Sequence, residues 1–97
     1  MLSTNLSLGG FRFEPQGEQI VLRTPEGAAT TRLAGFLAGI RHLLKMQLDL
    51  EGQAEMDGGL VVRIEGDVVR LKLGGYVESF PVAQVERLFR QLAAEPA

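Results

Sequence analysis

Two stretches in which apolar residues alternate, joined by Gly66-Asp67, constrain the fold of this chain most strongly. A period of two predicts half-buried strands, and a two-residue loop at Gly66-Asp67 predicts that they form a β-hairpin. In that register Ile64 lies beside Val69. Val62 then lies beside Leu71, so that the apolar side chains share one face of an antiparallel sheet. The alternating apolar residues are Leu60, Val62, Ile64, Val69, Leu71 and Leu73.

Two other segments carry the spacing of amphipathic helices. The first follows Thr30 or Thr31, either of which is a suitable N-cap residue. The second begins at Pro81, because proline is favoured in the first turn of a helix. In the first segment the apolar positions are Leu33, Phe36, Leu37, Ile40, Leu43 and Leu44. In the second segment they are Val82, Val85, Leu88, Phe89 and Leu92.

The N-terminal segment is expected to form a separate two-strand hairpin. Apolar residues between Leu6 and Phe13 nearly alternate, with one interruption at Gly9-Gly10, which predicts a single strand with a bulge or bend. A turn at residues 15–17 leads into a short strand over residues 20–22. That strand is expected to end at the turn-forming segment 24–27, just before the first helix.

The remaining segments complete an α+β fold. Leu48 and Leu50 are candidates for the start of a further strand, and Asp57-Gly58-Gly59 breaks the pattern after them. Gly74-Gly75 leads into a strand over residues 76–80. We therefore expect a two-strand hairpin, a helix, a three- or four-strand antiparallel meander and a C-terminal helix, with both helices packed on one face of a curved sheet. The prediction is one domain over residues 1–97, without an internal repeat.

Composition excludes several classes of protein. Hydrophobic residues make up 45% of the 97 residues, which is typical of one globular domain. The net charge of -2 argues against strong non-specific attraction to nucleic acid or to an anionic membrane. The chain has no cysteine and one histidine, so we expect no metal and no cofactor. It has no signal-peptide or membrane-span pattern, which predicts a cytoplasmic protein without membrane contact.

A basic strip is predicted on the outer face of the central hairpin. Arg63 lies opposite Arg70 in the register above, and two like charges in direct opposition destabilise a sheet unless an anion lies nearby. One interpretation is a single-stranded nucleic-acid site; the other is a solvated face neutralised by Glu65 and Glu78. The candidate nucleic-acid contacts are Arg63, Arg70, Lys72 and Tyr76.

The first helix carries two glycines four residues apart, each of which costs about 1 kcal/mol relative to alanine in a helix. Close approach of another backbone would offset that cost. The approaching backbone could belong to the same chain or to the same helix of a second copy, and this face is where we expect a homodimer or a protein partner to bind. The candidate interface residues are Ala34, Gly35, Ala38, Gly39 and His42.

No pattern of catalytic or metal-binding residues stands out. His42 has no serine or paired acid at a diagnostic spacing, so the chain is not expected to be an enzyme. Four acids, Asp49, Glu51, Glu55 and Asp57, suggest calcium, but their spacing departs from the calcium-loop pattern, and solvated loop charge is the better interpretation.

One short motif resembles a known family. Asn5, Ser7 and Gly10 form Asn-x-Ser-x-x-Gly at the entry to an apolar strand, which is similar to the second signature of the PilZ domain family. In that family the signature helps to bind cyclic di-GMP. The family's Arg-x-x-x-Arg motif is missing before Asn5, and the helix over residues 33–44 interrupts the expected barrel. The resemblance therefore implies a degenerate member that acts through protein partners.

The sequence thus favours a non-enzymatic binding or adaptor domain that acts through protein–protein contacts and forms a homodimer. One alternative is a single-stranded nucleic-acid-binding protein that uses the basic sheet face; some small DNA-binding folds have a similar architecture. The other alternative is a degenerate PilZ-like regulatory domain.

Overall fold

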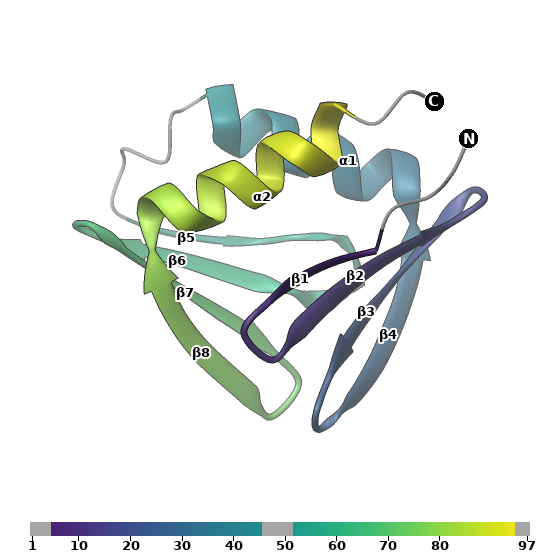
Figure 1. The fold of residues 1–97 in the computed structure, drawn as a ribbon, viewed down its shortest axis with the longest axis horizontal. Helices are drawn as coiled ribbons and strands as arrows, with labels where there is room; N and C mark the ends of the chain where they lie inside the picture. The colour runs from purple at the N-terminus through teal and green to yellow at the C-terminus, as the bar shows by residue number, and fades with distance from the viewer. Residues whose placement is uncertain (1–4, 46–51, 95–97) are drawn as a thin grey trace.

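The computed structural model describes residues 5–45 and 52–94, which form eight strands, two α-helices and one 3-10 turn (Figure 1). The first half consists of β1 (Leu6–Leu8), β2 (Phe11–Gln16), β3 (Gln19–Thr24), β4 (Gly27–Arg32) and α1 (Leu33–Lys45). The second half consists of β5 (Gly52–Glu55), η1 (Asp57–Gly59), β6 (Val61–Glu65), β7 (Val68–Leu73), β8 (Tyr76–Pro81) and α2 (Val82–Ala94). The predicted α+β class is confirmed.

The strands form two antiparallel sheets, each of which follows chain order: β1-β2-β3-β4 and β5-β6-β7-β8. The register predicted for the central hairpin is confirmed, with Ile64 opposite Val69 and Val62 opposite Leu71. The expected single sheet is divided in two. The division follows from β4, which completes a four-strand meander before α1 and leaves the strands after α1 to form a sheet of their own.

The two halves repeat each other, so the prediction of no internal repeat is wrong. From β3 onward every strand and helix recurs 49 residues later, with α1 at 33–45 and α2 at 82–94. The backbone N–H of Leu33 donates to the carbonyl oxygen of Glu18 at 2.9 Å, and Val82 donates to Asp67 at 2.8 Å in the same place. At this offset the identical pairs are Gly9/Gly58, Gly10/Gly59, Gly17/Gly66, Leu22/Leu71, Ala34/Ala83, Arg41/Arg90 and Leu43/Leu92.

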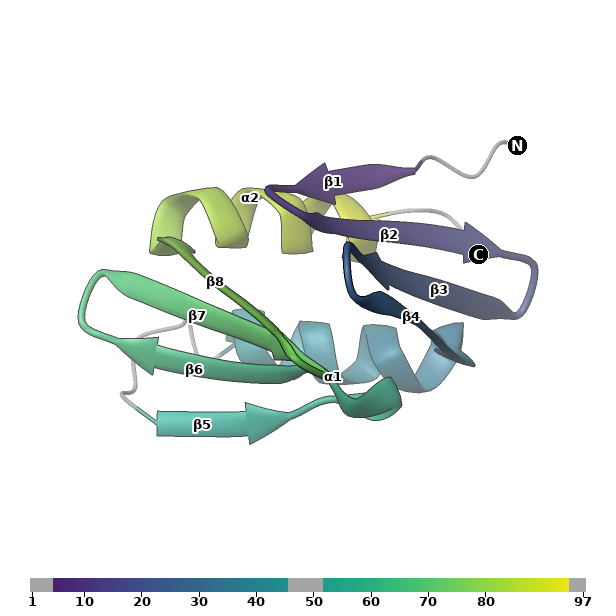
Figure 2. The same cartoon turned by 90° about the horizontal axis from the view of Figure 1, so that it is seen from below.

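The sheets face each other at an angle, and the two helices lie side by side across the wide end (Figures 1 and 2). At the narrow end the β3–β4 and β7–β8 turns approach each other (Figure 1). Both inner sheet faces and both helices contribute to one core, because no element could bury its apolar face alone. The side chains that are less than 2% exposed include Phe11, Phe13, Phe36, Phe89, Ile20, Leu22, Ile40, Leu60 and Leu71.

Three expectations for the N-terminal half are corrected. Gly9-Gly10 forms a reverse turn rather than a bulge, since Leu8 pairs with Phe11 across it and Gly9 has a φ of +58°. The segment after residue 24 turns back as β4, which pairs with β3 along its length. Thr30 and Thr31 therefore lie in a strand and do not cap α1, which begins at residue 33.

The C-terminal elements are close to the prediction. Pro81 ends β8, and α2 begins one residue later. A strand does precede Asp57, but it is Gly52–Glu55. Leu48 and Leu50 lie outside the described residues.

Candidate functional site

One of the two clefts between the sheets is closed by the side chains of Tyr76 and Glu78 on β8. The Tyr76 ring lies edge-on to Phe11 with a centroid separation of 5.2 Å. Its hydroxyl donates to Oε1 of Glu78 at 2.6 Å, and the backbone N–H of Gly10 donates to the same oxygen at 2.9 Å. This pair of donors ties the β1–β2 turn of the first sheet to the edge strand of the second.

These hydrogen bonds shift both ionisable groups. The Tyr76 hydroxyl, followed by the Gly10 N–H, lowers the pKa of Glu78 because both donors favour the carboxylate. The hydrogen bond to Glu78 raises the pKa of Tyr76, because deprotonation would remove the donor and place two negative charges together.

The glycines of the β1–β2 turn are required by this closure. A Cβ atom on Gly10 would overlap the Tyr76 hydroxyl. On Gly9 it would lie 2.6 Å from the Glu78 carboxylate oxygens. Only a residue without a side chain permits the turn to approach β8 so closely.

The repeat places different residues in the second cleft. At the offset of 49, Gly27 takes the position of Tyr76, Ala29 that of Glu78, and Gly59 that of Gly10. A Cβ atom on Gly59 would have no heavy atom within 4 Å, in contrast to Gly10. The second cleft is therefore open where the first is closed.

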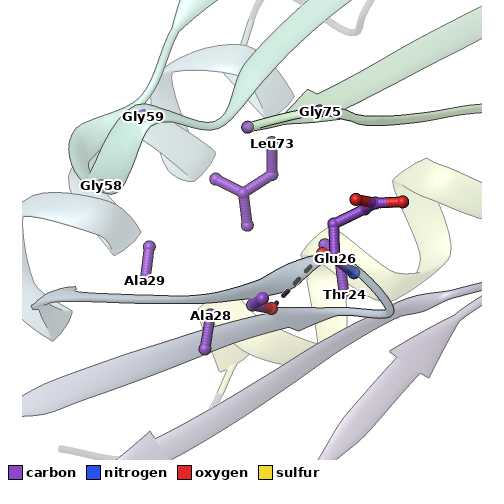
Figure 3. A pocket seen from close by; sticks show the side chains of 10 residues that line it. Thr24, Glu26, Ala28, Ala29, Gly58, Gly59, Leu73 and Gly75 are labelled. Carbon is purple, nitrogen blue, oxygen red and sulfur yellow. Dashed lines mark hydrogen bonds between the residues drawn. The ribbon is translucent and has the colours of Figure 1, made fainter.

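The open cleft is a pocket of about 310 Å³ between the β3–β4 turn, η1 and the β7–β8 turn (Figure 3). The side chains of Leu73 and Ala29 face its interior (Figure 3). Its volume is at the lower end of the range of roughly 300–1,000 Å³ found for small-ligand sites. The lining residues are Thr24, Glu26, Gly27, Ala28, Ala29, Gly58, Gly59, Leu73, Gly74 and Gly75.

Few polar side chains line this pocket. The Thr24 hydroxyl accepts from the N–H of Glu26 at 3.1 Å and lies 3.3 Å from the carbonyl oxygen of Gly27, so it is engaged within its own turn. The N–H of Gly59 donates to the carbonyl of Met56 at 3.1 Å. Among the described lining residues, Glu26 supplies the ionisable side chain, and it is exposed.

The predicted basic strip is present in part. Arg63 lies opposite Arg70 on the outer face, and Glu65 contacts both, at 2.8 Å and 4.0 Å. Lys72 is exposed on the same face, whereas Tyr76 pairs with Leu73 and turns to the inner face. The described outer face of this sheet therefore carries no aromatic side chain beside the arginines.

The first sheet carries an equivalent charge cluster that the sequence analysis missed. Arg12 lies opposite Arg23, and Glu14, only 8% exposed, contacts them at 3.8 Å and 2.8 Å. The missed signal was the register of β2 and β3, which is set by the two-residue turn at residues 17–18 and places Arg12 opposite Arg23. Each outer sheet face thus holds two opposed arginines and one glutamate that contacts both of them.

The glycine face of α1 is covered by the chain itself. Gly35 lies against the carboxylate of Asp57, and a Cβ atom on Gly39 would lie 2.7 Å from the terminal methyl of Met56. We expected another backbone at these glycines, from the chain's own sheet, the C-terminal helix or a second copy, but the neighbouring atoms are the side chains of Met56 and of Asp57 in η1. The other candidate interface residues of α1, Ala34, Ala38 and His42, are exposed.

The remaining candidates stay apart from the pocket. Glu55 and Asp57 lie at the end of β5 and in η1, while Asp49 and Glu51 are outside the described residues. Over residues 5–45 and 52–94, no three acidic or histidine side chains gather as a metal site would require, and no helix has the length and hydropathy to cross a membrane. Of the PilZ-like motif, Asn5 and Ser7 are exposed.

Comparison with known proteins adds no family to this description. No family model, no curated protein and no solved structure matches the chain.

Proposed function

We propose that this chain is a non-enzymatic binding domain that acts through protein contacts, with the pocket between the β3–β4 and β7–β8 turns as its binding site. The observation that carries the proposal is the difference between the two clefts. The fold closes one with its own side chains and leaves the equivalent one open. A partner's side chain can enter the open cleft in the way that Tyr76 enters the closed one.

The chemistry of the lining supports binding rather than catalysis. A catalytic site needs a nucleophile, or an acid and a base, that converge on one reacting atom. Thr24 is bound within its own turn, and Glu26 has no ionisable partner among the described residues that line the pocket. His42 is exposed on α1, away from the pocket.

Peptide selection tests this proposal directly. Random peptides are displayed and selected against the immobilised chain, and the selected peptides are then measured against two variants. Ala29→Leu fills the pocket, whereas Ala83→Leu makes the same substitution at an exposed position on α2. We expect peptides that bind the wild-type chain and Ala83→Leu and lose at least tenfold in affinity for Ala29→Leu, which corresponds to about 1.4 kcal/mol. Peptides that bind all three equally would place the binding site elsewhere.

A second candidate function is single-stranded nucleic-acid binding on the outer sheet faces. The opposed arginines on both sheets, Arg12 with Arg23 and Arg63 with Arg70, favour it. The intervening glutamates and the inward position of Tyr76 weigh against it, since sequence-tolerant binding to single strands relies on exposed stacking aromatics. Salt-dependent oligonucleotide binding that is lost when Arg63 and Arg70 are changed together to glutamine would support this function.

A further inference from the structure

We propose that the pocket accepts one aromatic ring that carries a hydrogen-bond donor, the side chain of a tyrosine from a different protein. This inference rests on the proposed binding function and names the chemical group that enters the site. It is argued from the closed cleft, from the polar groups at the pocket and from the placement of the chain's own aromatic residues.

The closed cleft supplies the template for the ring. Tyr76 fills that cleft with its ring edge-on to Phe11. In the open cleft the counterpart of Phe11 is Leu60, which is fully buried, so an apolar residue is kept at that position. The counterpart of Tyr76 is Gly27, whose missing side chain leaves space: a Cβ atom there would have no heavy atom within 4 Å. The apolar position is retained, whereas the ring of Tyr76 and the carboxylate of Glu78 both have no counterpart, because Gly27 and Ala29 stand at their positions.

The polar groups favour a donor on the ring. In the closed cleft the phenol donates to the carboxylate of Glu78. In the open cleft the N–H of Gly59 is already bound to Met56, while Glu26 contributes a carboxylate to the lining. Glu26, an exposed residue of the lining, is the acceptor that we assign to the phenol, and a benzyl group could not use it.

The chain cannot supply this ring from a second copy. Its five phenylalanines, Phe11, Phe13, Phe36, Phe80 and Phe89, are all at most 6% exposed. Its single tyrosine, Tyr76, occupies the closed cleft. Any of these rings would have to leave the core to enter the pocket of a neighbour. The occupant must therefore come from another molecule.

The test is an NMR titration of the ¹⁵N-labelled full chain with N-acetyl-L-tyrosinamide. We expect saturable shifts at the amides of Gly59, Gly74 and Gly75, with a dissociation constant on the order of 1 mM for so small a ligand. The phenylalanine analogue should bind about three- to tenfold more weakly because it lacks the donor. The leucine analogue should bind more weakly still.

Three variants make the outcome decisive. Ala29→Leu should abolish the shifts, and Ala83→Leu, at an exposed position on α2 outside the candidate interface, should preserve them. Glu26→Ala removes the acceptor from an exposed side chain and should bring the affinity of the tyrosine analogue close to that of the phenylalanine analogue. Equal affinity for the leucine and tyrosine analogues, or unchanged shifts in Ala29→Leu, would overturn the inference.

The two proposals fail in different ways. If selected peptides need an open pocket but contain no aromatic residue, the binding function stands and the tyrosine inference fails. If no selected peptide distinguishes Ala29→Leu from Ala83→Leu, and the tyrosine analogue does not bind, both fail.

Discussion

The two halves of this chain have the same order of strands and helix, and they differ in the residues through which they contact each other. In one cleft the β1–β2 turn packs on Tyr76 and Glu78 of β8. In the other, η1 packs against β4, where Thr31 lies 3.1 Å from a Cβ atom built on Gly58. The same backbone arrangement thus produces a closed cleft and an open pocket. The difference depends on the side chains of Tyr76 and Glu78 on the edge strand β8.

A second difference lies in the turns themselves. Leu6 pairs with Phe13 across the turn that contains Gly9-Gly10, and Ala54 pairs with Val62 across a segment that includes Asp57 and is one residue longer between the paired positions. The longer segment reaches α1, where Asp57 and Met56 cover two glycines. At the matching positions of α2 the residues are Gln84 and Leu88. The glycines of α1 are therefore an adjustment to one extra residue in a turn.

The largest expected effect tests whether the halves share one core. Leu22→Ala and Leu71→Ala remove equivalent buried side chains from β3 and β7. Each should lower the free energy of unfolding by about 2–5 kcal/mol, and both variants should unfold in a single transition in urea. Two separate transitions would show that the halves are independent and would break the comparison.

The glycine face of α1 should give the next largest effect. Gly39→Leu copies the residue found at the same place in α2, and the added side chain would collide with Met56. We expect a loss of about 1–3 kcal/mol in thermal or chemical unfolding. Ala38→Leu, on the exposed side of the same helix, is the control and should change stability by less than about 0.5 kcal/mol. A neutral Gly39→Leu would mean that the contact with Met56 is loose.

The closed cleft should respond to pH through the Tyr76–Glu78 pair. The pKa of Glu78 is lower in the folded chain than in the unfolded one. Its contribution to folding stability is therefore present above the unfolded pKa and is lost as the pH falls through the folded pKa. The pKa of Tyr76 is raised in the folded chain. Its contribution to folding stability is therefore present below the unfolded pKa and is lost as the pH rises through the folded pKa. Tyr76→Phe should move the Glu78 titration, followed by carboxyl NMR, back toward the ordinary glutamate value. An unmoved titration would contradict the hydrogen bond between the two side chains.

The smallest effect on stability is expected on the exposed faces of the helices. The predicted homodimer would use Ala34, Ala38 and His42 of α1. Ala38→Arg copies Arg87 of α2 and should turn a sedimenting dimer into a monomer, with a change in unfolding free energy below about 0.5 kcal/mol. The matched control, Arg87→Ala, should leave the dimer intact. A monomeric wild-type chain would remove the homodimer from the proposal.

The sequence predicted the elements whose patterns are strong. The hairpin around Gly66-Asp67 and the helix over residues 33–44 have unbroken apolar spacing, and both are present. β4 was missed because Gly27–Arg32 is made of glycine, alanine, threonine and arginine, with no alternating large apolar residues. The repeat was missed because its positions agree in apolar character more than in identity.

The candidate site was harder to predict, for a physical reason. A pocket is defined by residues that lack bulk, and Gly27 and Ala29 carry no signal in the sequence of one chain. Their meaning depends on the docking of the two sheets and on the comparison with Tyr76 and Glu78. The like-charge pair Arg63–Arg70 was predicted correctly because it needs only the register of one hairpin.

The uniform spacing of 49 residues has a consequence in evolutionary terms. It is the spacing expected of a ββββα unit copied in tandem, and the second copy has one residue more before β6. Two identical units would form two identical clefts. When both units lie on one chain, each cleft can change without the other, so that one can be selected for rigidity and the other for recognition.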